Sequence, residues 1–193
     1  MKDAIRLPIS FIHDGSMDVY TKMIVITELY YNQYEAGMGN DNKFPTQLEV
    51  AKNLRLTRQT VANRQKDPSY ALRSPRHTNF LQKKEKNIKT VDVPCELIKC
   101  PININERMIL ICILSYLKED FPVIPISQIT RDLSISKRTV ITHTNALEKL
   151  NLLMKKCIND NGGTYNVYSV PDDLDEQLTY AKVKMQLMSR NKC

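Results

Sequence analysis

Two short segments place side chains that can read base pairs at the start of a predicted helix. They are Arg58, Gln59, Asn63 and Arg64 in the first segment, and Lys137, Arg138, Thr142 and His143 in the second. Arginine can donate two hydrogen bonds to guanine, and glutamine or asparagine can pair in the same way with adenine. Both segments therefore predict contacts with base edges in the major groove of double-stranded DNA.

Thr57 and Ser136 directly precede these two predicted helices. A hydroxyl at this position accepts a hydrogen bond from the backbone of the first helical turn, and we expect this capping role for both residues. The same hydroxyl can also contact a DNA phosphate, so both residues belong to the predicted DNA-binding set.

Positive charge is concentrated in the middle of the chain. The net charge is +7, and residues 52–89 hold eleven lysines and arginines against two acids, Asp67 and Glu85. Such a concentration is typical of a phosphate-binding protein, although a solvated surface rich in lysine would look the same. We assign phosphate or minor-groove contacts to the lysines of two predicted hairpins, which are Lys83, Lys84, Lys86, Lys89, Lys155 and Lys156.

Three blocks of sequence occur twice and in the same order. Residues 7–12 are similar to 93–98, residues 22–29 to 107–114, and residues 54–61 to 133–140, with offsets of 86, 85 and 79. Three ordered matches indicate an internal duplication. The sequence therefore predicts two copies of one module, residues 1–90 and 91–170, followed by a C-terminal helix in residues 171–193.

The second copy shows the element order of a winged helix. Helices are predicted over residues 105–117, after a cap at Ser127, and after Ser136. Two strand-like segments, 151–158 and 164–170, then flank an Asn-Gly turn, which favours a β-hairpin.

The first copy repeats this plan less regularly. It has an opening helix over 20–31, a helix capped by Thr46, and a hairpin that pairs residues 80–84 with 88–91. The predicted fold class is mainly α with small β-hairpins (α+β), arranged as two tandem winged helix-turn-helix domains plus a C-terminal helix.

The repeated blocks resemble the helix-turn-helix modules of phage- and plasmid-encoded replication initiators and related transcription regulators. Residues 133–140, Leu-Ser-Ile-Ser-Lys-Arg-Thr-Val, match the pattern Leu-Gly-Val-Ser-Arg-Arg-Thr-Val of those modules. The modules also often open with a strand of the type hydrophobic-Pro-x-x-hydrophobic, and the resemblance covers residues 5–170. Arg55 and Ser134 replace the turn glycine, which matters because glycine accepts a positive φ at no steric cost.

The resemblance and the base-reading residues predict a sequence-specific DNA-binding protein, a phage- or plasmid-type transcription regulator. Two alternatives stay open: a replication initiator that binds an origin, and a winged-helix module that docks on a host protein. The chain lacks phosphate-loop, dinucleotide-binding, serine-hydrolase and zinc-protease motifs. Its three histidines are scattered and its five cysteines lack zinc spacing, so we predict no catalytic residue, cofactor or metal.

The C-terminal segment, residues 172–190, is predicted to form one helix with an apolar stripe. The stripe consists of Leu174, Leu178, Ala181, Met185 and Met188. About two heptads cannot hold a dimer alone, so the helix either packs on the second copy or supplements a homodimer contact. Of these two alternatives we favour the homodimer contact. The longest apolar run, 108–114, is too short to cross a membrane, and the first residues form no signal peptide, so we expect a cytoplasmic protein.

Overall fold

The same succession of a strand, a short helical turn and three helices occurs twice along the chain. The structure is a computed structural model that describes residues 3–35, 44–76, 88–160 and 163–190. The first half contains β1 (Ala4–Pro8), α1 (Ile9–Ile12), α2 (Val19–Tyr30), the π-helical turn η1 (Tyr31–Glu35), α3 (Gln47–Leu54), α4 (Arg58–Gln65) and α5 (Pro68–Ala71). The second half contains β2 (Thr90–Pro94), α6 (Cys95–Lys99), α7 (Ile104–Lys118), α8 (Ile126–Leu133), α9 (Lys137–Lys149), β3 (Met154–Asp160), β4 (Gly163–Ser169) and α10 (Leu174–Arg190).

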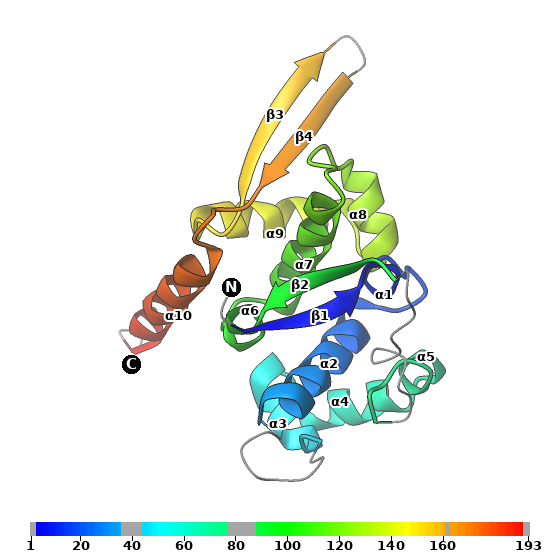
Figure 1. Cartoon of the computed structure of the whole chain (residues 1–193). Helices are drawn as coiled ribbons and strands as arrows, with labels where there is room; N and C mark the ends of the chain where they lie inside the picture. Colours follow the sequence, from blue (N-terminus) through cyan, green and yellow to red (C-terminus); the bar gives the residue numbers. More distant parts are fainter. Residues whose placement is uncertain (1–2, 36–43, 77–87, 161–162, 191–193) are drawn as a thin grey trace.

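The described residues are mainly helical and form two small antiparallel sheets, in agreement with the predicted α+β class. Figure 1 shows β1 and β2 crossing in front of α2 and α7, while the β3–β4 hairpin extends away from the helical body. No helix among the described residues is long and apolar enough to cross a membrane.

The two halves are joined by the antiparallel pairing of their first strands. Arg6 lies opposite Asp92, Leu7 opposite Val91, and Pro8 opposite Thr90. Because the offset between the repeats is 86 here, Arg6 and Asp92 occupy equivalent positions, and the pairing is symmetric about them. An approximate two-fold axis therefore relates the strands of the two halves.

This pairing corrects the hairpin predicted for the first half. Thr90 and Val91, assigned by sequence to that hairpin, lie in β2 and pair with β1. The other predicted strand, residues 80–84, lies outside the described residues. The β-branched residues Thr90 and Val91 suit a strand in either pairing, with residues 80–84 or with β1. Burial of Val91 in the core shared by both halves favours the pairing with β1.

Each repeat begins with a strand that ends at a proline, Pro8 or Pro94, and turns directly into a short helix. The long helices that follow, α2 and α7, pack together in one hydrophobic core built from both halves. Every residue of α2 except Tyr20 is buried. Such nearly complete burial explains why these helices are apolar on most sides.

Two buried cations tie each half to the other. Lys22 Nζ donates to the backbone oxygens of Ile12, at 2.7 Å, and Asp132, at 2.6 Å. Arg107, the equivalent residue, donates to the oxygens of Ile98, at 3.0 Å, and Asn53, at 3.1 Å. Ile12 and Ile98 are equivalent, as are Asn53 and Asp132, so the two sets of bonds match.

In each case the cation binds a backbone oxygen in the last turn of a helix from the opposite half. Lys22 reaches the end of α8, and Arg107 reaches the end of α3. A positive charge at this end of a helix interacts favourably with the helix dipole. The crossed bonds therefore fix the positions of α3 and α8, each of which carries the turn before α4 or α9.

The turns between these helices use a left-handed residue in place of glycine. Arg55 has φ 55° and Ser134 has φ 51°, each immediately after α3 or α8. The turn geometry is therefore retained without glycine. Thr46 caps α3 as predicted, but α8 begins at Ile126 with Pro125 at its N-cap, so Ser127 lies inside the first turn. A proline there fixes a suitable φ before the helix begins.

The predicted second hairpin and C-terminal helix are both present. In the hairpin, Met154 pairs with Ser169 at the base, and the register continues to Asp160 and Gly163. α10 packs on α6, where Leu178 is buried and its backbone oxygen lies 3.9 Å from Cys100 Sγ. The first part of the apolar stripe is thus covered within the chain, and a homodimer contact through α10 stays a prediction.

Candidate nucleic-acid interface

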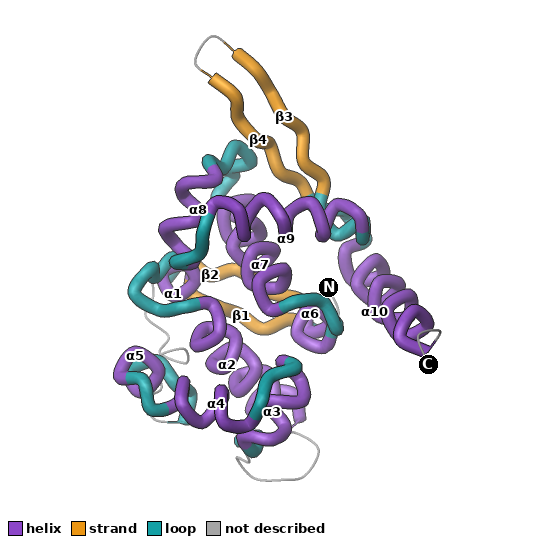
Figure 2. The backbone as a smooth tube through the Cα atoms, turned by 180° about the vertical axis from the view of Figure 1, so that it is seen from behind, coloured by secondary structure: helices purple, strands orange, loops and turns teal. Residues whose placement is uncertain are grey.

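The helices that follow the two left-handed turns, α4 and α9, lie on the side away from the β1–β2 sheet. Figure 2, seen from behind, shows α9 in front of α7 and α4 near the front of the lower half, with both strands farther back. Val61 anchors α4 in the core, and Val140 and Leu147 anchor α9. The solvent-exposed residues of both helices are available for contacts outside the chain.

On α4, three of the predicted base-reading residues are exposed, namely Arg58, Gln59 and Asn63. Gln59 Nε2 donates to Asn63 Oδ1 at 2.8 Å, one helical turn apart. Arg58 Nε lies 3.4 Å from Gln47 Oε1 of α3. The sequence analysis did not include Gln47, because its role depends on how α3 crosses α4.

On α9, Lys137, Arg138 and Thr142 are exposed. Within the described part of the chain, Lys137 and Arg138 form no ion pair, so their charges face solvent. Lys137 and Arg138 belong to the first turn of α9, the position from which such helices reach base edges.

Thr57 and Ser136 cap the two helices in the same way. Thr57 Oγ1 accepts from the backbone nitrogen of Thr60 at 3.0 Å, and Ser136 Oγ accepts from that of Thr139 at 3.1 Å. Each cap hydroxyl also lies 2.8 Å from the hydroxyl of the same threonine. The predicted capping role is confirmed, and both residues are exposed.

Three other predicted DNA-binding residues form ion pairs or hydrogen bonds with other side chains of the protein. Arg64 forms an ion pair with Asp18 at 2.7 Å, and His143 Nδ1 lies 3.1 Å from Glu106. Lys155 Nζ lies 2.9 Å from Glu148 and 2.6 Å from Asn145 Oδ1. These contacts hold α4 on α2, α9 on α7, and the hairpin on α9. The same residue types read DNA and pair with acids, so the sequence could not separate the two roles.

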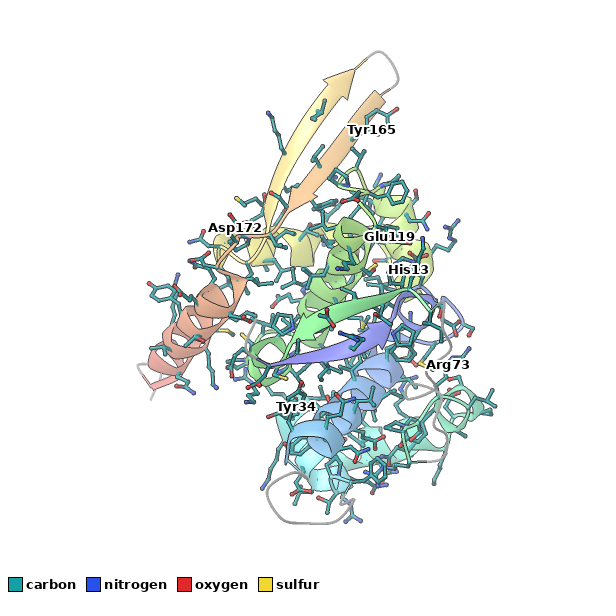
Figure 3. All side chains as sticks on the ribbon, viewed as in Figure 1. His13, Tyr34, Arg73, Glu119, Tyr165 and Asp172 are labelled. Carbon is teal, nitrogen blue, oxygen red and sulfur yellow. The ribbon has the colours of Figure 1, made fainter. Side chains whose placement is uncertain are left out.

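The lysines of the hairpins divide into three groups. Lys156 on β3 is exposed, and Lys89 pairs with Glu119 at 2.6 Å. Lys155 is paired as described above, and Lys83, Lys84 and Lys86 lie outside the described residues. Figure 3 labels Tyr165 on β4 of the projecting hairpin, well away from the helical body. Lys156 is therefore the described hairpin lysine that is best placed for a phosphate.

A buried carboxylate that the sequence analysis missed holds the C-terminal end of α4. Glu28 of α2 is fully buried and accepts hydrogen bonds from Tyr70 Oη at 2.7 Å, Gln65 Nε2 at 2.8 Å and Arg76 Nε at 2.7 Å. Burial, together with the nearby Glu28 charge, raises the pKa of the Tyr70 hydroxyl. The network ties α4 and α5 to α2 and so orients the exposed face of α4.

Comparison with protein-family models, curated proteins and solved structures gave no match for this chain.

Proposed function

We propose that this protein binds double-stranded DNA in a sequence-specific manner as a phage- or plasmid-type transcription regulator. In this proposal the chain carries two helix-turn-helix modules, with α4 and α9 as their recognition helices and the β3–β4 hairpin as the wing of the second module. The observation that carries the proposal is the equivalent placement of Arg58 and Lys137, each the exposed first residue of a helix that follows a left-handed turn. The next positions, Gln59 and Arg138, are equivalent and exposed as well.

The two recognition helices would enter major grooves of one duplex. Arg58, Gln59 and Asn63 would contact bases from α4, and Lys137, Arg138 and Thr142 from α9. Lys156 on the β3–β4 hairpin would meet the phosphate backbone beside the α9 site. The crossed bonds of Lys22 and Arg107 support this arrangement, because they hold both helices in a fixed relation before DNA arrives.

The central experiment selects bound sequences from random duplex DNA and then measures the affinity for the selected site. The variant Arg58→Ala with Arg138→Ala is expected to lose about 2–6 kcal/mol of binding free energy, at roughly 1–3 kcal/mol per base contact. The matched control, Arg6→Ala with Lys118→Ala, removes the same charge from exposed positions outside α4 and α9. The proposal fails if both double variants bind the selected site equally well.

The selected sequence also separates the three functions that the sequence analysis left open. A regulator is expected to protect a single site at a promoter, whereas a replication initiator would protect repeated copies of the site at an origin. A module that docks on a protein would yield no enriched DNA sequence, and it would keep its partner in the Arg58 and Arg138 double variant.

A further inference from the structure

A buried cluster of three metal-binding residue types lies where the first half meets α7 and α8. One donor atom each from His13, Cys112 and Asp132 lies within 4.8 Å of both others. Cys112 and Asp132 are buried, and His13, labelled in Figure 3, is half-buried at the end of α1. The three residues come from distant parts of the sequence, so no ligand spacing could have revealed them.

The surroundings of His13 leave one ring nitrogen suited to a metal. Ser115 Oγ donates its hydrogen to the backbone oxygen of Cys112 at 2.7 Å, because a carbonyl can only accept. His13 Nε2, 2.8 Å from the same Ser115 oxygen, is then assigned as the donor of that second bond. In the neutral ring this leaves the lone pair on Nδ1. Metal-binding histidines are characteristically oriented in this way through their other nitrogen.

Asp132 is also oriented by neighbouring groups. The Tyr116 hydroxyl donates to Asp132 Oδ2, and Gln128 Nε2 lies 3.3 Å from Oδ1. The Tyr116 ring in turn stacks on His13, with ring centroids 4.4 Å apart. Hydrogen-bonded carboxylates of this kind hold metal ligands in place, and each carboxylate oxygen can accept more than one contact.

The duplication provides an internal comparison for this cluster. By the offsets of the three repeated blocks, the positions equivalent to His13, Cys112 and Asp132 carry Lys99, Thr27 and Asn53. Thr27 is buried like Cys112, and Asn53 helps to bind Arg107. Because the fold accommodates non-ligand residues in one copy, packing alone does not require the His, Cys and Asp set in the other.

We propose that His13, Cys112 and Asp132 bind one divalent zinc-type ion at the junction of the two halves. Imidazole, thiolate and carboxylate together suit Zn²⁺ or Co²⁺, whereas Mg²⁺ and Ca²⁺ prefer oxygen ligands alone. On binding, the Cys112 S–H bond breaks, a metal–sulfur bond forms, and the proton leaves to solvent. No electron is transferred.

Charge balance is compatible with this site despite the neighbouring Lys22 ammonium. A divalent ion, a thiolate, a carboxylate and a neutral imidazole sum to zero net charge. Lys22 Nζ is directed at the backbone oxygens of Ile12 and Asp132, so it does not need the carboxylate of Asp132 as its acceptor. The bound ion would join the end of α1 to α7 and α8, and so hold the two halves together.

The test is titration of the chelator-treated, reduced full-length protein with Co²⁺, followed by absorbance of the thiolate-to-cobalt charge-transfer band. We expect one Co²⁺ per chain, displacement by Zn²⁺, and a melting temperature raised by about 5–10 °C at a hundredfold excess of Zn²⁺ over its dissociation constant. Cys112→Thr and His13→Lys introduce the residues of the other copy and are expected to abolish the band.

The matched control is Cys157→Ser, which removes an exposed cysteine from β3 and is expected to keep the band. Circular dichroism reports whether each variant folds. If Cys112→Thr or His13→Lys does not fold, Asp132→Asn, which also introduces the residue of the other copy, is tested in its place. The proposal is overturned if the wild type binds no stoichiometric Co²⁺. It is also overturned if the band survives in folded Cys112→Thr, or disappears in Cys157→Ser.

Discussion

Arg6 Nε and Asp92 Oδ1 lie 3.1 Å apart at the centre of the β1–β2 pairing, and the two residues occupy the same position in their repeats. In a symmetric pair of identical modules this position would face its own copy, and two like charges would repel. The duplicated chain places opposite charges there instead. The ion pair is well exposed, so its contribution to stability is small, and the apolar neighbours Ile5, Leu7, Val91 and Val93 supply most of the contact.

The crossed cations predict a strong and specific loss of stability on substitution. Arg107→Met leaves the backbone oxygens of Ile98 and Asn53 buried without their donor, which is expected to cost about 2–5 kcal/mol in free energy of unfolding. Arg107→Lys is expected to lose less than half as much, because Lys22 serves the equivalent role in the other half. Urea unfolding measures both values, and equal losses for Met and Lys would contradict the assignment.

The raised pKa of Tyr70 predicts a loss of stability at alkaline pH. The folded protein keeps the Tyr70 proton at pH values where the unfolded chain, with an ordinary pKa near 10, has released it. Stability from this group is therefore complete below pH 10 and falls above it, by about 1 kcal/mol per pH unit. Tyr70→Phe is expected to show a shallower decline above pH 10 in chemical unfolding. Parallel curves for both proteins would count against the buried Tyr70–Glu28 contact.

Substitution of Gly15 is expected to cause a steric clash that does not depend on the backbone angles of this residue. A Cβ at this position would lie 2.5 Å from the backbone oxygen of Arg131 in the last turn of α8. Ser134 also donates to the Gly15 oxygen, so the two segments are in direct contact. Gly15→Ala is expected to reduce the free energy of unfolding by about 1–3 kcal/mol. The exposed neighbour Ser16→Ala is the control, and a similar small change in both variants would refute the close approach.

The left-handed conformation of Arg55 predicts that a glycine at this position would increase stability. Its φ of 55° is strained for a residue with a side chain, and glycine adopts it freely. Arg55→Gly is therefore expected to raise the free energy of unfolding by about 0.5–1 kcal/mol. Arg55→Ala removes the same charge but keeps the strain, so thermal unfolding of the two variants separates the backbone effect from the charge. A stabilised Ala variant would show that charge is responsible.

Salt dependence tests the phosphate contacts of the proposed DNA complex. Each cation that neutralises a phosphate contributes about 0.9 to the slope of log K against log salt concentration. Lys156→Ala is expected to reduce the magnitude of that slope by about one and to weaken binding similarly for all sequences. Lys118→Ala, an exposed cation on α7, serves as the control. An unchanged slope for Lys156→Ala would remove the hairpin from the interface.

Local sequence signals predicted much of the helical framework correctly. The caps at Thr46, Thr57 and Ser136 and the pairing of β3 with β4 depend on neighbouring residues, and each is present in the structure. The Asn161-Gly162 turn predicted between these strands lies outside the described residues. The pairing of β1 with β2 was not predicted, because the paired residues lie 82 to 90 positions apart in the sequence and no local signal links them. The burial of Lys22 was missed for the same reason, since its acceptor Asp132 belongs to the other half.

The candidate site was only partly predictable for a related physical reason. Position after a capped turn identified Arg58 and Arg138 as surface residues of their helices. The same rule included Arg64 and His143, whose acidic partners Asp18 and Glu106 come from other helices. Whether a cation is free or paired depends on tertiary contacts, which helix position alone does not specify.

The crossed bonds of Lys22 and Arg107 also limit how this molecule can be re-engineered. In each half, a backbone oxygen in the last turn of one helix accepts a hydrogen bond from a cation of the other half. Replacing a whole half with a foreign module would therefore remove the hydrogen-bond donor for that helix end in the half that is kept. New specificity is better introduced by changing solvent-facing side chains on α4 or α9 while the interlocked interior is left intact.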